Sequence, residues 1–409
     1  MAEAAPQHLR QLTALRFFAA AWVVLYDYLP LLTGARPAVI DKGYLGVELF
    51  FVLSGFILCH VYLAAFGEKR ARYADFLWAR LARIYPVHLA ILIGLALLVL
   101  AARLAGLDIG GKLAVVASLP AQILLLQAWG LAPHGGWNHP AWSISAEWFA
   151  YLTFPAFAFV FWRLRRRPWL ALVLTGLGGV AVNLGFQALT GAALTHATIA
   201  WGALRIVPCF ALGCAVWLMW SAGLPKGRPA AILLTLAAVA AIGLLTAVQA
   251  PDWTAILAFG ALILGLGAMA REGSARLTHP ILVYLGEVSF AIYMVCIPWQ
   301  LLVQDGAGHL LGLQGERLPW PLWLVLVAGV VPAAMIVHHL VERPAREIMR
   351  RHGVPFLRRP APPEQPAPEA DPHQVLAAEL WRHTYGRPPT PGLSPALLLR
   401  IIAFTRSRR

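Results

Sequence analysis

Residues 12–32 read LTALRFFAAAWVVLYDYLPLL, an apolar stretch long enough to cross a bilayer as a helix, and its only charged side chains are Arg16 and Asp27. Eleven steps of about 100° make about 1100°, roughly 20° past three full turns, so both side chains leave one face of the helix. They lie about 16 Å apart along its axis. A charge at mid-membrane costs on the order of 2.5–3.5 kcal/mol on insertion scales, so such residues face a protein-lined or water-filled interior. We therefore predict that this helix lines a polar cavity.

The composition of the whole chain agrees with a membrane protein. Of 409 residues, 59% are hydrophobic and 13% are charged, against about 25% charged residues in soluble domains. Apolar stretches of about 20 residues recur along the chain, and the alternation of a transmembrane barrel is absent from its sequence. We predict an all-α, polytopic protein with about ten spans, at 12–33, 43–66, 84–105, 141–162, 168–190, 203–221, 229–248, 253–270, 281–303 and 319–341.

The connections between the spans carry an orientation signal. Basic residues follow the even-numbered spans, and the odd-numbered connections hold almost none. The positive-inside rule then predicts that both termini are cytoplasmic. The apolar segment 112–131 is interrupted by Pro120 and Gly130, and we expect it to be re-entrant or interfacial. The basic residues are Lys69, Arg70, Arg72, Arg80 and Arg83, then Arg163 and Arg165 to Arg167, then Lys226 and Arg228, then Arg271 and Arg276, and finally Arg343, Arg346, Arg350 and Arg351.

The net charge of +14 needs no nucleic-acid partner, because topology signals and attraction to anionic membrane lipid account for it. Four cysteines, all inside predicted spans, show no metal-ligand spacing, and we expect small core residues and no metal site. They are Cys59, Cys209, Cys214 and Cys296.

The chain divides into a transmembrane domain over 1–350, a Pro-rich linker over 351–372 and a small basic helical tail over 373–409. The tail is predicted to form two short helices. A small folded domain and a basic amphipathic tail on the inner leaflet are both compatible with its pattern.

Polar residues near the first four spans mark candidate site positions. Glu48 is expected at the membrane interface, and Ser54, beside a glycine, either permits close helix packing or belongs to the site. Arg80 and Arg83, with the neighbouring Tyr85, either provide the positive-inside signal alone or form a cytoplasmic mouth that binds the phosphates of an anionic ligand.

A second informative run is 137–149, which begins the fourth span. Ser143 and Glu147 are four residues apart and so share one helix face. Trp142 fits an aromatic belt, and Ser145 lies in the same turn. We consider two roles for Glu147: a catalytic carboxylate, or a structural partner of Arg205, itself a possible intramembrane charge.

Two further carboxylates lie at helix ends. Glu287 is expected near the cytoplasmic end of the ninth span, and Glu342, before Arg343 and Pro344, is most simply a signal that ends the last helix.

Six segments, in order over residues 8–350, resemble the acyltransferase-3 family of bacterial integral-membrane O-acyltransferases. They are 12–20, 43–56, 80–86, 142–147, 285–293 and 340–344. The resemblance implies a bacterial inner-membrane location, about ten spans and a cytoplasmic acyl-CoA donor, often acetyl-CoA. It also implies an acceptor hydroxyl on a sugar, a lipid-linked glycan or a small molecule, and no tightly bound cofactor.

The chain departs from the family at one position. Family members usually carry a histidine, thought to be the base, where this chain has Asp27, and Cys296 stands where a second histidine is frequent. An aspartate has a pKa near 3.9 in water, but desolvation raises it by up to 3–5 units in a fully buried site. Three interpretations are open: Asp27 replaces the histidine, another group such as His139 does so, or the chain is catalytically impaired.

We therefore expect an O-acyltransferase with Asp27, Arg16 and Glu147 as catalytic residues. Its expected substrate-binding residues are Ser54, Arg80, Arg83, Tyr85, Trp142, Ser143, Ser145 and Arg205. Direct transfer is expected, because no nucleophile with an adjacent base is evident. The rivals are a transporter or flippase and a non-catalytic relative that binds ligand.

Overall fold

The computed structural model describes residues 9–104, 115–132, 135–311 and 317–353, with a few residues near the C-terminus (379–382, 394, 396, 397 and 400). The chain separates into two compact units, Met1–Gly353 and Val354–Arg409. Most of the predicted linker and tail therefore lies outside the described residues, and the helices of the bundle all belong to the first unit.

All regular structure in the described residues is helical, and ten of the helices are long and apolar enough to cross a membrane, which confirms the predicted class. They are α1 (Arg10–Thr33), α3 (Gly46–Gly67), α4 (Tyr73–Leu104), α6 (Ala141–Leu164), α7 (Pro168–Thr190), α8 (Gly202–Ser221), α9 (Arg228–Ala247), α10 (Asp252–Arg271), α11 (Pro280–Leu311) and α12 (Trp320–Val337). The last continues through a π-helical turn, His338–Glu342, into α13 (Arg343–His352).

One long helix begins earlier than predicted. α4 starts at Tyr73 instead of 84, and its 32 residues extend about 48 Å, well beyond the apolar thickness of a bilayer. Hydropathy alone missed its first turns because they contain charged residues. Arg80 and Arg83 are consequently held on a regular helix rather than on a loop.

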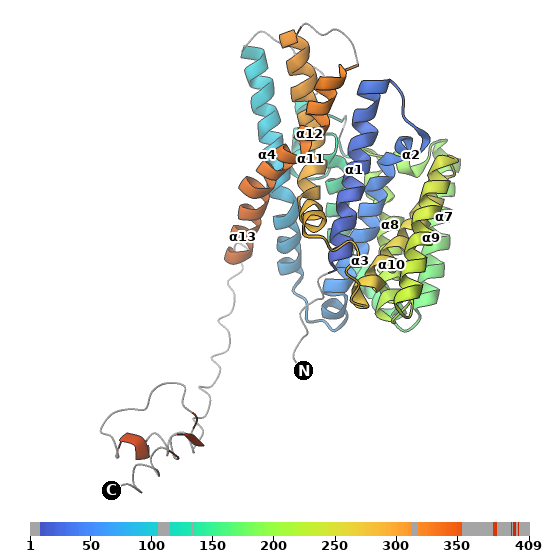
Figure 1. Ribbon diagram of the computed structural model, residues 1–409, viewed down its shortest axis with the longest axis vertical. Coiled ribbons are helices and arrows are strands. Elements are labelled where there is room, and N and C mark those ends of the chain that lie inside the picture. The colour runs from blue at the N-terminus through green and yellow to red at the C-terminus, as the bar shows by residue number, and fades with distance from the viewer. Residues whose placement is uncertain are drawn as a thin grey trace. The chain divides into compact units, whose positions relative to one another are not determined.

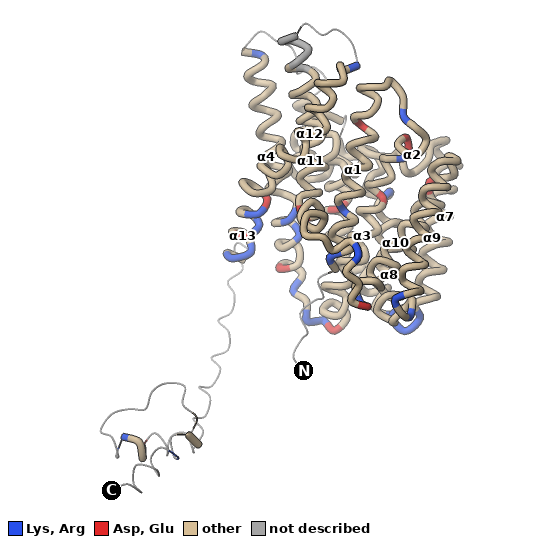
Figure 2. The backbone as a smooth tube through the Cα atoms, viewed as in Figure 1, with Lys and Arg blue, Asp and Glu red and all other residues tan. Residues whose placement is uncertain are grey.

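Successive spans run in opposite directions, so every second connection lies at the same end of the bundle. The connections at one end follow the second, fourth, sixth and eighth spans, which are α3, α6, α8 and α10, and the tenth span, α12, ends there too. We call this the basic end; α1 begins there and α3 ends there. Lys and Arg residues gather at this end and along α13 (Figure 2). The other end is called the opposite end.

The helices form a bundle in which α1 and α3 lie centrally, with α4, α11 and α12 on one side and α7, α8, α9 and α10 on the other (Figure 1). In the most hydrophobic 18-residue stretch of each helix, the buried share is 67% in α8 and 61% in α10. It is only 11% in α7, so α7 presents most of its surface to lipid.

Close packing of α3 on α8 depends on two glycines. A Cβ atom on Gly213 would lie 1.9 Å from the carbonyl oxygen of Val52, and one on Gly55 would lie 2.1 Å from that of Phe210. Small residues let membrane helices approach in this way. Ser54 is therefore held on a tightly docked helix.

The segment predicted as re-entrant or interfacial has no spanning helix in its described part. From residue 115 onward it contains a 3-10 turn (Val116–Ser118) and the five-residue α5 (Leu119–Ile123), and residues 112–114 lie outside the described residues. All four cysteines are buried and free, which confirms their predicted place in the core.

Candidate active site

A cavity of about 330 Å³ lies among α1, α3, α4, α6 and α11. Its size falls in the range of small-molecule sites. Arg16 lines it, as predicted for the first helix. Its other polar lining residues are Thr13, Ser54, His60, Arg80, Arg83, Ser143, Glu147, Tyr151 and Tyr293.

The cavity is elongated along the helices. On α3 the lining residues run from Val47 to Val61, which are about 21 Å apart along the axis. On α1 they stop at Arg16, within the half of the helix nearer the basic end. The cavity therefore extends through much of the apolar thickness of a bilayer, which is about 30 Å.

Three arginines give the cavity a surplus of positive charge. Arg16 and Arg83 make no hydrogen bond or ion pair with any residue the structure describes. Arg80 donates one hydrogen bond to the Tyr62 hydroxyl (3.2 Å), while its Nε is buried without a partner in the described part of the chain. Half-buried guanidinium groups left in this state offer free N–H donors to an anion.

Glu147 supplies the negative charge in the middle of the cavity. Its Oε1 accepts a hydrogen bond from the Ser54 hydroxyl (2.9 Å) and another from the Tyr151 hydroxyl. Arg16 lies within electrostatic range of both Glu147 and Arg83. A carboxylate, a hydroxyl and a guanidinium thus lie together inside the bundle.

Asp27 does not line this cavity, although Arg16 does. The expectation that both charged residues face one cavity is met by Arg16 and not by Asp27 for this cavity. Tyr28, the residue after Asp27, is fully buried and donates to the Cys296 carbonyl oxygen (2.6 Å). Two side chains that leave one face of a helix share a cavity only if the neighbouring helices leave room along the whole face. Asp27 itself is half-buried and has no hydrogen bond or ion pair with a described residue.

A loop before α6 is hydrogen-bonded to α11 beside the cavity. The Tyr293 hydroxyl donates to the Pro140 carbonyl oxygen (3.1 Å), and the Asn138 amide donates to that of Met294 (2.9 Å). His139, the alternative base, lies on this loop with an exposed side chain and does not line the cavity. The protein around the ring partly desolvates it. This desolvation, together with the charge of Arg205, lowers the pKa of His139.

Four predicted substrate-binding residues lie outside the cavity lining. Ser145 is buried and bonded to backbone groups of Leu125 and Ala128. Trp142 is buried, and the guanidinium carbon of Arg205 lies 4.4 Å from the centroid of the Trp142 ring. Tyr85, half-buried on α4, also does not reach it.

Arg205, the fourth, pairs with Glu48 through a hydrogen-bonded ion pair, and both side chains are almost fully buried. This corrects one expectation, since the partner of Arg205 is Glu48 and not Glu147; Glu48 lies in the first turn of α3 and is enclosed by protein. The two residues are 157 positions apart, so their pairing has no local sequence signal.

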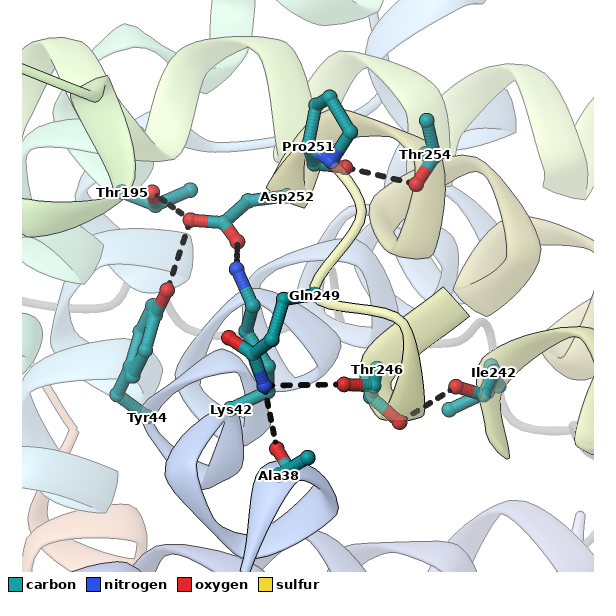
Figure 3. A network of polar contacts seen from close by, with 10 residues as sticks. All are labelled: Ala38, Lys42, Tyr44, Thr195, Ile242, Thr246, Gln249, Pro251, Asp252 and Thr254. Carbon is teal, nitrogen blue, oxygen red and sulfur yellow. Dashed lines mark hydrogen bonds and ion pairs between the residues drawn. The ribbon is translucent and has the colours of Figure 1, made fainter. Parts of the chain in front are cut away.

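A second polar network holds the opposite end together (Figure 3). Asp252, at the start of α10, binds Lys42 (2.6 Å) and the Tyr44 hydroxyl (2.9 Å), and it accepts a hydrogen bond from Thr195. The Gln249 amide donates to the Ala38 carbonyl oxygen (2.8 Å). These contacts fix the connection after α1 against the α9–α10 turn, and nothing in the sequence pointed to them.

Tyr151 is a lining residue that the sequence did not single out. It lies four residues after Glu147, so helical spacing alone could have found it.

The two carboxylates expected at helix ends differ in their surroundings. Glu342 does not end a helix; the chain continues into α13, and the buried Glu342 carboxylate contacts His338 Nδ1 at 2.8 Å. Glu287, by contrast, is exposed at the basic end.

The fold and this cavity define a multi-pass membrane protein with a charged internal site. Its sequence matches the model of the acyltransferase-3 family, described as an acyltransferase domain, over residues 9–339, and the chain belongs to this family. It is therefore an acyl-transferring membrane enzyme.

Two curated proteins are similar to the chain, and the first of them is named an acyltransferase. The chain is 29% identical over 353 residues to "Acyltransferase MdmB" of Streptomyces mycarofaciens, covering 79% of this chain and 86% of that protein. It is 36% identical over 88 residues to "Protein 2 in picA locus" of Rhizobium radiobacter, covering 22% of this chain and 44% of that protein. No solved structure matches.

Proposed function

We propose that this enzyme moves an acyl group, most simply acetyl, from acyl-CoA to a hydroxyl of a sugar, a glycan or a small molecule. The observation that carries the proposal is the cavity itself, which combines unpaired arginines with a carboxylate. A donor with several phosphates and a thin, uncharged thioester arm matches that distribution of charge.

The donor would approach from the basic end, which the positive-inside rule makes cytoplasmic. Its phosphates would bind Arg80 and Arg83, whose forked guanidinium donors suit phosphate oxygens. Its pantetheine arm would extend along the apolar wall formed by Leu12, Leu53 and Ile57. The thioester would then lie between Arg16 and Glu147.

At that point the acyl carbon is attacked by an oxygen, the carbon–sulfur bond breaks, and CoA leaves as a thiolate. Glu147 would accept the proton of the attacking hydroxyl and return it to the thiolate sulfur, while Arg16 would stabilise the negative oxygen of the tetrahedral intermediate. Of the two carboxylates predicted to be catalytic, Glu147 is the one that lines the cavity, so we assign the proton transfer to it. A role for Asp27 stays a prediction.

Sealed membrane vesicles of both orientations test the donor and its side of approach. Radiolabelled acetyl-CoA does not cross the bilayer, so label should enter acceptors only in inverted vesicles, which expose the cytoplasmic face. Labelling confined to right-side-out vesicles, or no consumption of acetyl-CoA in either, would contradict the proposal. Mass spectrometry of surface glycans and metabolites, with and without the gene, identifies the acceptor by its lost acyl mass.

A further inference from the structure

Five hydroxyl groups line the cavity: those of Thr13, Ser54, Ser143, Tyr151 and Tyr293. Three of them are satisfied by backbone carbonyl oxygens, since Thr13 donates to Leu9, and both Ser143 and Tyr293 donate to Pro140. The other two, Ser54 and Tyr151, donate to the carboxylate of Glu147. Of these two hydroxyls, that of Ser54 is aliphatic and that of Tyr151 is phenolic.

This arrangement is that of an activated nucleophile. Covalent catalysis requires a hydroxyl within about 2.6–3.2 Å of a base, and a third group that orients the base. The 2.9 Å separation of Ser54 Oγ and Glu147 Oε1 satisfies the first condition. Tyr151, fully buried and bonded to the same oxygen, satisfies the second. The sequence did not show this pair, because Ser54 is on α3 and Glu147 on α6.

The surroundings of Ser54 favour a negative charge on a reacting acyl group. Arg16 faces the same cavity and lies within electrostatic range of Glu147 and Tyr151. A guanidinium in a site shielded from water stabilises a developing oxyanion more strongly than it would in solution. Nucleophile, base and oxyanion donor are therefore all present around one cavity.

The limited volume of the cavity gives a covalent intermediate a purpose. Tyr293 and Asn138 fasten the loop before α6 to α11, which holds this wall of the cavity in place. A bound acyl group held on the protein would let the donor leave through the basic end before the acceptor arrives. The two substrates would then never need to occupy the 330 Å³ together.

We propose that Ser54 is a catalytic nucleophile that carries the acyl group as an ester between two half-reactions. The inference rests on the proposed acyl-CoA donor. In the first step Ser54 Oγ attacks the thioester carbon, Glu147 takes the serine proton, the carbon–sulfur bond breaks, and the proton passes to the departing thiolate. In the second step the acceptor hydroxyl attacks the ester, Glu147 takes its proton, and that proton returns to Ser54 Oγ.

Isotope exchange tests the first half-reaction without an acceptor. The purified full chain in lipid nanodiscs is mixed with acetyl-CoA and labelled free CoA, and label should appear in acetyl-CoA. Acid quenching followed by peptide mass spectrometry should find one acetyl group, labile to hydroxylamine, on the peptide that contains Ser54. The Ser54→Ala variant should show neither exchange nor acetylation, whereas Thr153→Val, which removes a hydroxyl bonded only to backbone and outside the cavity lining, should show both.

The outcomes separate this inference from the proposed function. If the wild type transfers acetyl groups but shows no exchange and no acetylated peptide, the covalent step is wrong and the function stands. If Ser54→Ala elutes as a monodisperse protein and still transfers at the wild-type rate, the covalent step is likewise wrong. If the wild type consumes no acetyl-CoA under any condition, the proposed donor fails instead.

Discussion

Replacing Glu147 with glutamine removes the proposed base and leaves the shape of the cavity almost unchanged. The amide oxygen can still accept hydrogen bonds from Ser54 and Tyr151, so the packing of α3 on α6 should persist. General base catalysis contributes about 10²- to 10⁴-fold to a rate. We therefore expect Glu147→Gln to lower kcat by about that factor, with little change in the KM for acetyl-CoA.

The assay uses inverted vesicles with labelled acetyl-CoA and the acceptors present in the host's own membranes and extract. Asp27→Asn is the matched control, since it makes the same chemical change at the carboxylate outside the cavity. It should retain activity within about threefold of the wild type, because the Asp27 carboxylate does not line the cavity and makes no hydrogen bond or ion pair with a described residue. A large loss in Asp27→Asn together with near-normal Glu147→Gln would refute the assignment and restore Asp27 as the base.

Other contacts in the bundle lead to three further expected outcomes. Arg83→Ala should raise the KM for acetyl-CoA about tenfold or more, because one hydrogen bond to a charged group contributes about that much to binding. Arg350→Ala, at an exposed position on α13, should leave the KM unchanged. Initial-rate kinetics measure both values. Arg205→Ala should cost about 3–5 kcal/mol of stability, because it leaves the buried Glu48 carboxylate without its partner. The melting temperature in detergent should fall, and replacing both residues with apolar ones should recover part of the loss. An unchanged melting temperature of Arg205→Ala would contradict this. Gly213→Val should prevent α3 from docking on α8 and abolish folded, monodisperse protein, so a well-folded variant would count against that interface.

The spans could be predicted from the sequence because each depends on a local property. A stretch of about 20 apolar residues must cross the bilayer as a helix, whatever surrounds it. The early start of α4 was missed for the same reason, since charged turns beyond the membrane carry no hydropathy signal.

The site was only partly predictable. Arg16, Arg80, Arg83, Ser54, Ser143 and Glu147 were all named from sequence, and the structure places them around one cavity. Pairings between distant segments were not recoverable, because helix periodicity gives the direction of a side chain but not the helix it meets. Glu48 with Arg205, and Ser54 with Glu147, are examples. The position of Asp27 failed in the same way, since neighbouring helices decide whether a face is open.

If acyl transfer takes place beside Arg16 and Glu147, the sulfur atom of the bound donor must lie there too. An electron cryomicroscopy structure with a thioether analogue of acetyl-CoA locates that atom. We expect phosphate density at Arg80 and Arg83, and the sulfur atom within about 4 Å of the Ser54 and Glu147 side chains. Density for the sulfur beside Asp27, or for the whole molecule outside the cavity, would show that the transfer takes place elsewhere.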